Sequence, residues 1–99
     1  MSVYLIMDIE ITDEQSYAEY RSLVPPIIEK FGGTYLARGG WAKNVEGDWQ
    51  PNRIVVLEFE SSEVANAFLD SPEYEPVRSI RHKASNSRGI LVEAFNASQ

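Results

Sequence analysis

The chain has 99 residues, 43% of them hydrophobic, which is enough for one globular domain with a modest core. Its formal charge of −6 opposes binding to nucleic acid or to an anionic membrane through long-range repulsion. The absence of cysteine excludes disulfides, thiolate metal sites and a cysteine nucleophile. Acidic residues interrupt the apolar N-terminal run and no basic segment precedes it, so we expect no signal peptide, no membrane span and a cytoplasmic protein.

The N-terminal third predicts a strand followed by a helix. Residues 3–11 place apolar side chains at every second position, which is the period of a strand. Thr12–Gln15 matches a capping box and predicts a helix start. Pro25-Pro26 predicts a kink or a restart within that helix, and Gly32-Gly33 ends it. Its inner stripe consists of large apolar side chains at spacings of three or four, namely Tyr17, Tyr20, Val24, Ile27 and Phe31.

Two further strands flank a turn-rich connection. Thr34–Arg38 predicts a short second strand, and the glycine pair after it allows the backbone to bend. We expect Gly33 or Gly40 to require a positive φ. Trp41–Asn52 joins the second strand to Arg53–Glu60, which is the most apolar strand because hydrophobic side chains occupy both of its faces.

The last third predicts two short helices and a final strand. Ser61–Glu63 is a good cap for the second helix. Ser71-Pro72-Glu73 ends that helix and starts another, because serine caps helices and proline suits the first helical position. Gly89–Phe95 supplies the last strand. The order β-α-β-β-α-β predicts an α+β, ferredoxin-like fold, with a four-stranded antiparallel sheet and its helices on one face.

The predicted sheet leaves its other face without helices. We place the first and third strands parallel and adjacent, which brings Asp8 and Glu58 to the same end, either as an acid–base pair or as partners of nearby arginines. An open apolar face is a liability for a soluble monomer, so we expect a second copy of the chain to cover it. The residues of this face on the two strands are Tyr4, Ile6, Asp8, Ile54, Val56 and Glu58.

Several strings in the second and third quarters of the chain point to a known family. FGGTYLARGG, EGDW, P-x-R, EF and SPEY, followed by Arg81 and Ala84, resemble in this order the signature of the DUF1330 family, and the resemblance covers nearly the whole chain. It implies a single domain over residues 1–99 and a subunit of the dimeric α/β-barrel group. The family is one of unknown function, and the wider group includes cofactor-free monooxygenases, isomerases, haem enzymes and ligand-sensing modules, so the fold alone selects no activity.

Six side chains are the predicted ligand-binding residues, and Arg38 leads them. Its planar guanidinium suits a carboxylate, and the following glycine pair permits close backbone approach. The alternative role for Arg38 is a structural salt bridge to Glu58 or Glu46. The other five predicted residues are Tyr35, Trp41, Arg53, Tyr74 and Arg81. We expect no metal and no cofactor, because the single histidine lacks partners and the glycines lack the spacing of a phosphate loop.

His82 lies in a basic stretch at residues 78–88, where an exposed helix position is the simpler interpretation. Favourable charge at a helix C-terminus explains part of this stretch, and a small organic anion would explain the rest.

Two functions stay open from the residues. One is a binding or accessory module that holds a small organic anion near Arg38. The other is a cofactor-independent enzyme of the monooxygenase or isomerase type acting on a small organic acid. No clear acid–base pair is visible, which favours binding, and a purely structural homodimer is a third option.

Overall fold

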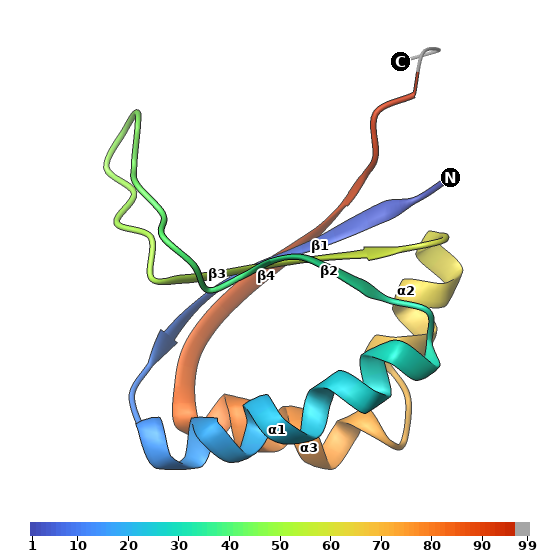
Figure 1. Cartoon of the computed structure of the whole chain (residues 1–99), viewed down its shortest axis with the longest axis horizontal. Helices are drawn as coiled ribbons and strands as arrows, with labels where there is room; N and C mark the ends of the chain where they lie inside the picture. Colours follow the sequence, from blue (N-terminus) through green and yellow to red (C-terminus); the bar gives the residue numbers. More distant parts are fainter. Residues whose placement is uncertain (97–99) are drawn as a thin grey trace.

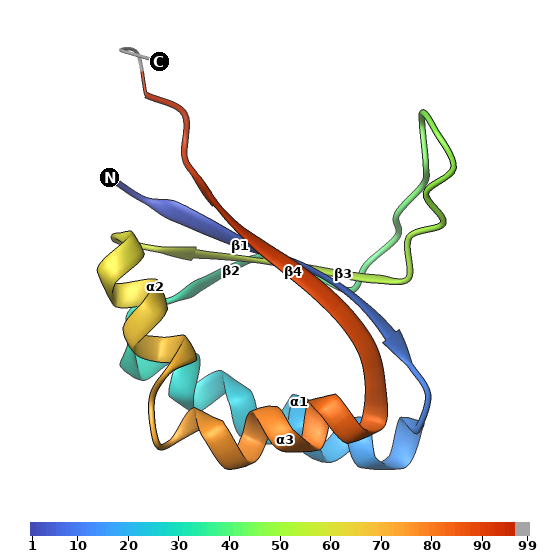
Figure 2. The ribbon, with the colours of Figure 1, turned by 180° about the vertical axis from the view of Figure 1, so that it is seen from behind.

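The computed structural model describes residues 1–96, so the last three residues of the predicted single domain lie outside the described part. Four strands form one antiparallel sheet in the order β2-β3-β1-β4, and three helices lie on one side of it (Figures 1 and 2). This is the predicted ferredoxin-like arrangement. The elements are β1 (Val3–Ile11), α1 (Glu14–Lys30), β2 (Thr34–Arg38), β3 (Arg53–Phe59), α2 (Ser62–Leu69), α3 (Tyr74–Ala84) and β4 (Ser85–Glu93).

The central strands β1 and β3 are adjacent, as predicted, but they run antiparallel. Tyr4 pairs with Glu58 and Asp8 pairs with Ile54, so the two carboxylates lie at opposite ends of the strand pair. The predicted parallel placement of β1 and β3 was wrong. Helix α1 connects β1 to β2, and these two strands are parallel, whereas β3 lies between them and runs antiparallel to each. The predicted acid–base pair of Asp8 and Glu58 therefore does not form.

The core lies between the sheet and the helices. Three aromatic rings form its centre: the centroid of Phe68 lies 5.4 Å from that of Phe59 and 4.4 Å from that of Tyr74, both in stacked geometry. Around them lie the buried apolar side chains of the inner sheet face and of the helices, namely Val3, Leu5, Ile9, Val55, Leu57, Tyr17, Tyr20, Val24, Ile28, Ala65, Val77 and Ala84.

Helix α1 begins one residue later than the predicted capping box. Asp13 is the cap: its carboxylate accepts one hydrogen bond from the Ser16 hydroxyl and another, of 3.1 Å, from the Ser16 amide. These two bonds lower the pKa of the Asp13 carboxyl. The helix continues through Pro25-Pro26, so the predicted restart is wrong. Burial of Val24 and Ile28 on either side of the prolines stabilises the helix against their propensity.

The glycine pairs behave differently from the prediction. Neither Gly33 nor Gly40 holds a positive φ, whereas Gly32 and Gly39, the first glycine of each pair, both have φ of 74°. The left-handed residue is the one directly after the helix or strand, because it turns the chain there. Gly33 is required for space instead, since an added Cβ would lie 2.7 Å from the side chain of Ile28.

The face of the sheet opposite the helices carries no helix. Residues 39–52 form an arm that rises from this side at one end of the sheet, and the end of β4 rises at the other (Figures 1 and 2). Large apolar side chains are exposed on both, with Trp41 89% and Val45 90% exposed on the arm and Ile90 60% and Phe95 86% exposed along β4 and after it. Within residues 1–96, no helix is long and apolar enough to cross a membrane.

Candidate functional site

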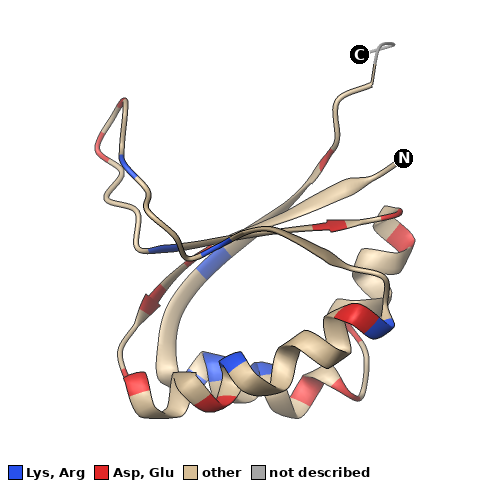
Figure 3. Cartoon of the chain, viewed as in Figure 1, with Lys and Arg blue, Asp and Glu red and all other residues tan. Residues whose placement is uncertain are grey.

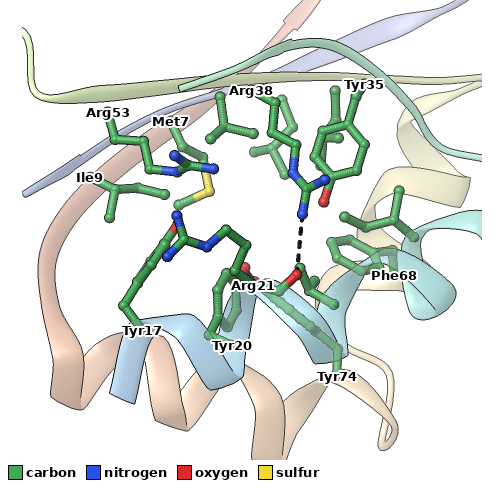
Figure 4. A pocket seen from close by; sticks show the side chains of 15 residues that line it. Met7, Ile9, Tyr17, Tyr20, Arg21, Tyr35, Arg38, Arg53, Phe68 and Tyr74 are labelled. Carbon is green, nitrogen blue, oxygen red and sulfur yellow. Dashed lines mark hydrogen bonds between the residues drawn. The ribbon is translucent and has the colours of Figure 1, made fainter. Parts of the chain in front are cut away.

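A narrow cavity between the sheet and α1 is lined by arginine and aromatic side chains (Figure 4). Its volume of about 30 Å³ admits one or two water molecules or an anionic head group. Four of the six predicted site residues line it, namely Tyr35, Arg38, Arg53 and Tyr74. The polar and aromatic side chains that join them from α1 are Tyr17, Tyr20 and Arg21.

A bulge in β2 turns Arg38 toward the cavity. Tyr35 pairs with Leu57 and Arg38 pairs with Val55, and the register shifts between positions 35 and 37. Both partners lie on the helix-facing side of β3, so Tyr35 and Arg38 share that side although they are three residues apart, which a regular strand would not allow. The guanidinium carbon of Arg38 lies 4.7 Å from the centre of the Tyr35 ring, a cation–π contact that helps to orient it.

The acceptor that anchors Arg38 is available because of a proline. Nη2 of Arg38 donates to the backbone carbonyl of Arg21, at 3.1 Å. In a regular helix this oxygen accepts from the amide four residues later, and Pro25 has no amide hydrogen. Ion pairs among residues 1–96 involve neither Arg38 nor its predicted alternative partners Glu58 and Glu46, so that salt bridge does not form.

Three positive charges line the cavity without a carboxylate. The guanidinium carbons of Arg21 and Arg53 lie 5.6 and 5.7 Å from the centre of the Tyr17 ring. Nε of Arg53 is buried without a hydrogen-bond partner in the described part of the chain. In Figure 3, basic positions lie where β2 and β3 meet the arm and along the helices opposite. The cavity is thus locally cationic in a protein of net charge −6, and it has unused capacity to bind an anion.

Two phenols close the inner end of the cavity. The hydroxyls of Tyr20 and Tyr74 lie 2.9 Å apart and are buried. Burial, reinforced by the neighbouring Tyr74, raises the pKa of Tyr20 far above its ordinary value, and burial also raises the pKa of Tyr35. The phenols of Tyr20 and Tyr35 stay neutral at physiological pH. They can therefore donate and accept hydrogen bonds, but they are poor general bases.

The other two predicted residues lie elsewhere. Trp41 is exposed on the arm and does not line the cavity. Arg81 lies behind Tyr20, with its guanidinium carbon 5.9 Å from the centre of that ring, and lines a separate hollow between α3 and β4. His82 lines the same hollow and is exposed, as predicted. Its pKa is lowered, first by partial desolvation of the imidazole and then by the charges of Arg81 and Arg78.

Asp8 holds the arm against the open face of the sheet. Its buried carboxylate accepts from the indole nitrogen of Trp49 at 2.7 Å and from the amide of Asn52 at 3.0 Å, and the guanidinium of Arg88 lies 3.8 Å away. The pairing with an arginine was one of the two predicted roles. These contacts assign Asp8 to the position of the arm rather than to acid–base chemistry.

The model of a family described as a domain of unknown function, DUF1330, matches residues 2–95. The chain belongs to the DUF1330 family. This confirms the resemblance that the sequence strings indicate. No curated protein matches the sequence.

Solved structures share the fold of this DUF1330 chain at low identity. RPA0582, a protein of unknown function from Rhodopseudomonas palustris, is 17% identical, with a TM-score of 0.78 over 96% of this chain and 83% of that one. A dimeric ferredoxin-like protein of unknown function from Jannaschia sp. CCS1 is 9% identical, with a TM-score of 0.72 over 95% and 100% of the two chains. SnoaB, a cofactor-independent oxygenase from Streptomyces nogalater, is 15% identical, with a TM-score of 0.61 over 97% and 95%. At these identities the likeness shows the fold alone.

Sequence reasoning missed the part of the DUF1330 cavity that α1 supplies. Tyr17 and Tyr20 were assigned to the helix stripe and therefore to the core, where they are indeed buried. Arg21 lies four residues after Tyr17 and so on the same helix face. An arginine beside a buried aromatic stripe was the available signal, and Pro25 four residues later was the signal for the free carbonyl of Arg21.

Proposed function

We propose that this DUF1330 protein binds a small organic anion, whose acidic group lies among Arg21, Arg38 and Arg53. The observation that supports it is the set of three guanidinium groups around one cavity, with no carboxylate of residues 1–96 paired to any of them. Arg21 and Arg53 are partly buried whereas Arg38 is exposed, and partly buried charge is unfavourable unless an opposite charge or hydrogen bonds compensate it. A carboxylate supplies both, because it accepts two parallel hydrogen bonds from an arginine fork.

Binding is a better proposal than catalysis for this site. A cofactor-independent oxygenase or isomerase needs a group that takes a proton from its substrate, and two phenols of the cavity, those of Tyr20 and Tyr35, have raised pKa values. The carboxylates that formed the predicted acid–base pair lie at opposite ends of their strands. The similarity to SnoaB is a similarity of fold and adds no proton acceptor to this cavity.

The test is a thermal-shift and calorimetric screen of small aliphatic and aromatic carboxylates. A ligand at 100 times its Kd stabilises a protein by about 2.7 kcal/mol, which is a readily measured rise in Tm. Arg38→Lys keeps the charge but loses the fork, so we expect it to keep the fold and lose the shift. Arg78→Lys is the matched control, because Arg78 contacts Tyr74 from outside the cavity. Equal shifts in the wild type and Arg38→Lys, or no shift with any carboxylate, would overturn the proposal.

We also propose that two copies associate through the open face of the sheet. Ile6 and Val56 pair at the centre of this face, and no helix of the described residues covers them. Two solved structures of this fold are described as dimeric ferredoxin-like proteins. Ile6→Glu would place an unpaired charge in the interface and should give a monomer by light scattering. A monomer mass for the wild type at micromolar concentration would contradict the proposal.

A further inference from the structure

A second hollow lies on the helix side of the sheet, between α3 and β4. It has a volume of about 300 Å³ and is open to solvent along β4, an edge strand. Gly89 contributes to it because this residue has no side chain to fill the space between the strand and the helix. Its walls are apolar at one end, from Leu69 and Leu91, and basic at the other, from Arg81.

Arg81, like Arg53, has a buried Nε without a hydrogen-bond partner and no carboxylate paired to its guanidinium among residues 1–96. Arg81 is almost fully buried, with a relative exposure of 5%. Nη1 donates to the hydroxyl of Ser87, and among residues 1–96 this is the only hydrogen bond of the guanidinium. None of the ion pairs of those residues includes Arg81. A second buried guanidinium thus lacks a counter-charge, and it faces a hollow large enough for part of a ligand.

The hollow and the cavity share part of their lining. Leu5 and Met7 line both of them, so this pair of side chains borders the two spaces. Methionine is unbranched and has three rotatable bonds, which makes Met7 the side chain that can most easily move to connect the spaces. In Figure 4 the side chain of Met7 lies beside Arg53 at the roof of the cavity.

The volumes indicate where the body of a ligand would lie. The cavity at Arg53, of about 30 Å³, holds an acidic group and little more, whereas binding sites for small organic molecules are typically about 300–1,000 Å³. The hollow at Arg81, of about 300 Å³, has the volume that the body of such a molecule requires. Joined, the two spaces form an apolar passage along Leu5 and Met7 with an unpaired guanidinium at each end.

We propose that the ligand is an elongated molecule with an acidic group at each end, one bound at Arg53 and the other at Arg81, and an apolar body that passes Met7. This inference rests on the proposed anion-binding function, because it takes the cavity of Arg38 and Arg53 as one end of the site. It adds the chemical class of the ligand and a second, separate anion position.

The experiment compares straight-chain dicarboxylates of increasing length with the monocarboxylates of equal length, by calorimetry on the full chain. We expect an optimum length at which the dicarboxylate binds at least tenfold more tightly than its monocarboxylate. Arg81→Gln should reduce this ratio to about one and leave monocarboxylate affinity within about twofold. Arg78→Gln, one turn earlier on α3 and outside both spaces, is the control that keeps the ratio.

Two further measurements keep the inference testable if Arg81→Gln does not fold. Met7→Phe should block the passage and abolish the length optimum while both arginines remain. The pKa of His82, the single histidine, should rise when a dicarboxylate of optimal length is bound, because the charge of Arg81 contributes to lowering it and a bound carboxylate offsets that charge. A monocarboxylate of the same length should leave this pKa unchanged.

The outcomes separate the two proposals. Binding of monocarboxylates that depends on Arg38 but shows no preference for dicarboxylates would overturn the two-ended ligand and leave the proposed function in place. A preference that survives both Arg81→Gln and Met7→Phe would do the same. If neither class of acid binds the wild type, both proposals fail.

Discussion

Replacing Gly39 by alanine should weaken anion binding, whereas the same change at Gly32 should lower stability alone. Both glycines have φ of 74°, so alanine meets the same backbone penalty at each, about 1–2 kcal/mol. The surroundings differ. A Cβ on Gly39 would lie 2.2 Å from Nη1 of Arg53 and 2.5 Å from its Cζ, whereas a Cβ on Gly32 would have no atom within 4 Å.

The structure sets the size of each effect. Arg53 must leave its position in Gly39→Ala, but the contacted atoms are the end of a flexible side chain, so the two variants should differ in unfolding free energy by about 1 kcal/mol or less. Each should lose about 4–8 °C in Tm per kcal/mol. The hydrogen bonds of one guanidinium to a carboxylate contribute about 1.5–3 kcal/mol, so losing Arg53 should weaken a carboxylate ligand by about 10- to 100-fold.

Urea unfolding gives the stability of both variants, and calorimetry with the best carboxylate from the screen gives their affinity. Wild-type affinity in Gly39→Ala would show that Arg53 takes no part in binding. Loss of affinity in Gly32→Ala would show that the effect comes from general destabilisation. Unchanged stability in both variants would refute the assigned backbone penalty.

Three other changes test separate parts of the structure. Pro25→Ala and Pro26→Ala should each stabilise α1, by up to about 3 kcal/mol in urea unfolding. Only Pro25→Ala supplies an amide to the backbone carbonyl of Arg21 that anchors Arg38, so only this variant should weaken carboxylate binding. An equal loss of affinity in both variants would contradict this. Tyr20→Phe and Tyr74→Phe should each cost about 1–3 kcal/mol because the remaining hydroxyl loses its buried partner, and the double variant should cost less than their sum; additive losses would refute the pairing. The lowered pKa of Asp13 means that its contribution to stability is present above the unfolded pKa of about 3.8 and is lost as the pH falls through the folded pKa. Asp13→Asn should remove this dependence from the urea midpoint below pH 4, and an unchanged profile would contradict the assignment.

Periodicity was sufficient to predict the fold, because the central strands β1 and β3 and the helices bury apolar stripes. The alternation of Val3, Leu5 and Ile9 and the helix spacing of Tyr17 and Tyr20 both lead to buried positions. The direction of β3 relative to β1 is a property of the connections and not of either strand's pattern. It could have been predicted from the topology, since the helical crossover links the two parallel strands.

The site was less predictable because its geometry depends on irregular features. Arg38 and Tyr35 share a face only through a bulge, and alternation along β2 assigns them to opposite faces. The position of Arg81 behind Tyr20 follows from how α3 packs beside α1, which no local pattern encodes. Residue types chemically suited to an anion were visible in the sequence, but which of them share a cavity was not.

The bulge of β2 also has a consequence for how related chains should be aligned. Removing one residue between Tyr35 and Arg38 would restore a regular strand in which the two side chains are two positions apart, so the arginine would stay on the cavity side of the sheet. In family members with a single-residue gap at this point, an arginine aligned with Arg38 would therefore still be its structural equivalent, whereas in an ungapped relative without the bulge the arginine would lie on the opposite side of the sheet. The combination of strand spacing and bulge, rather than the identity of one aligned column, should distinguish the relatives that keep this cavity from those that share only the fold.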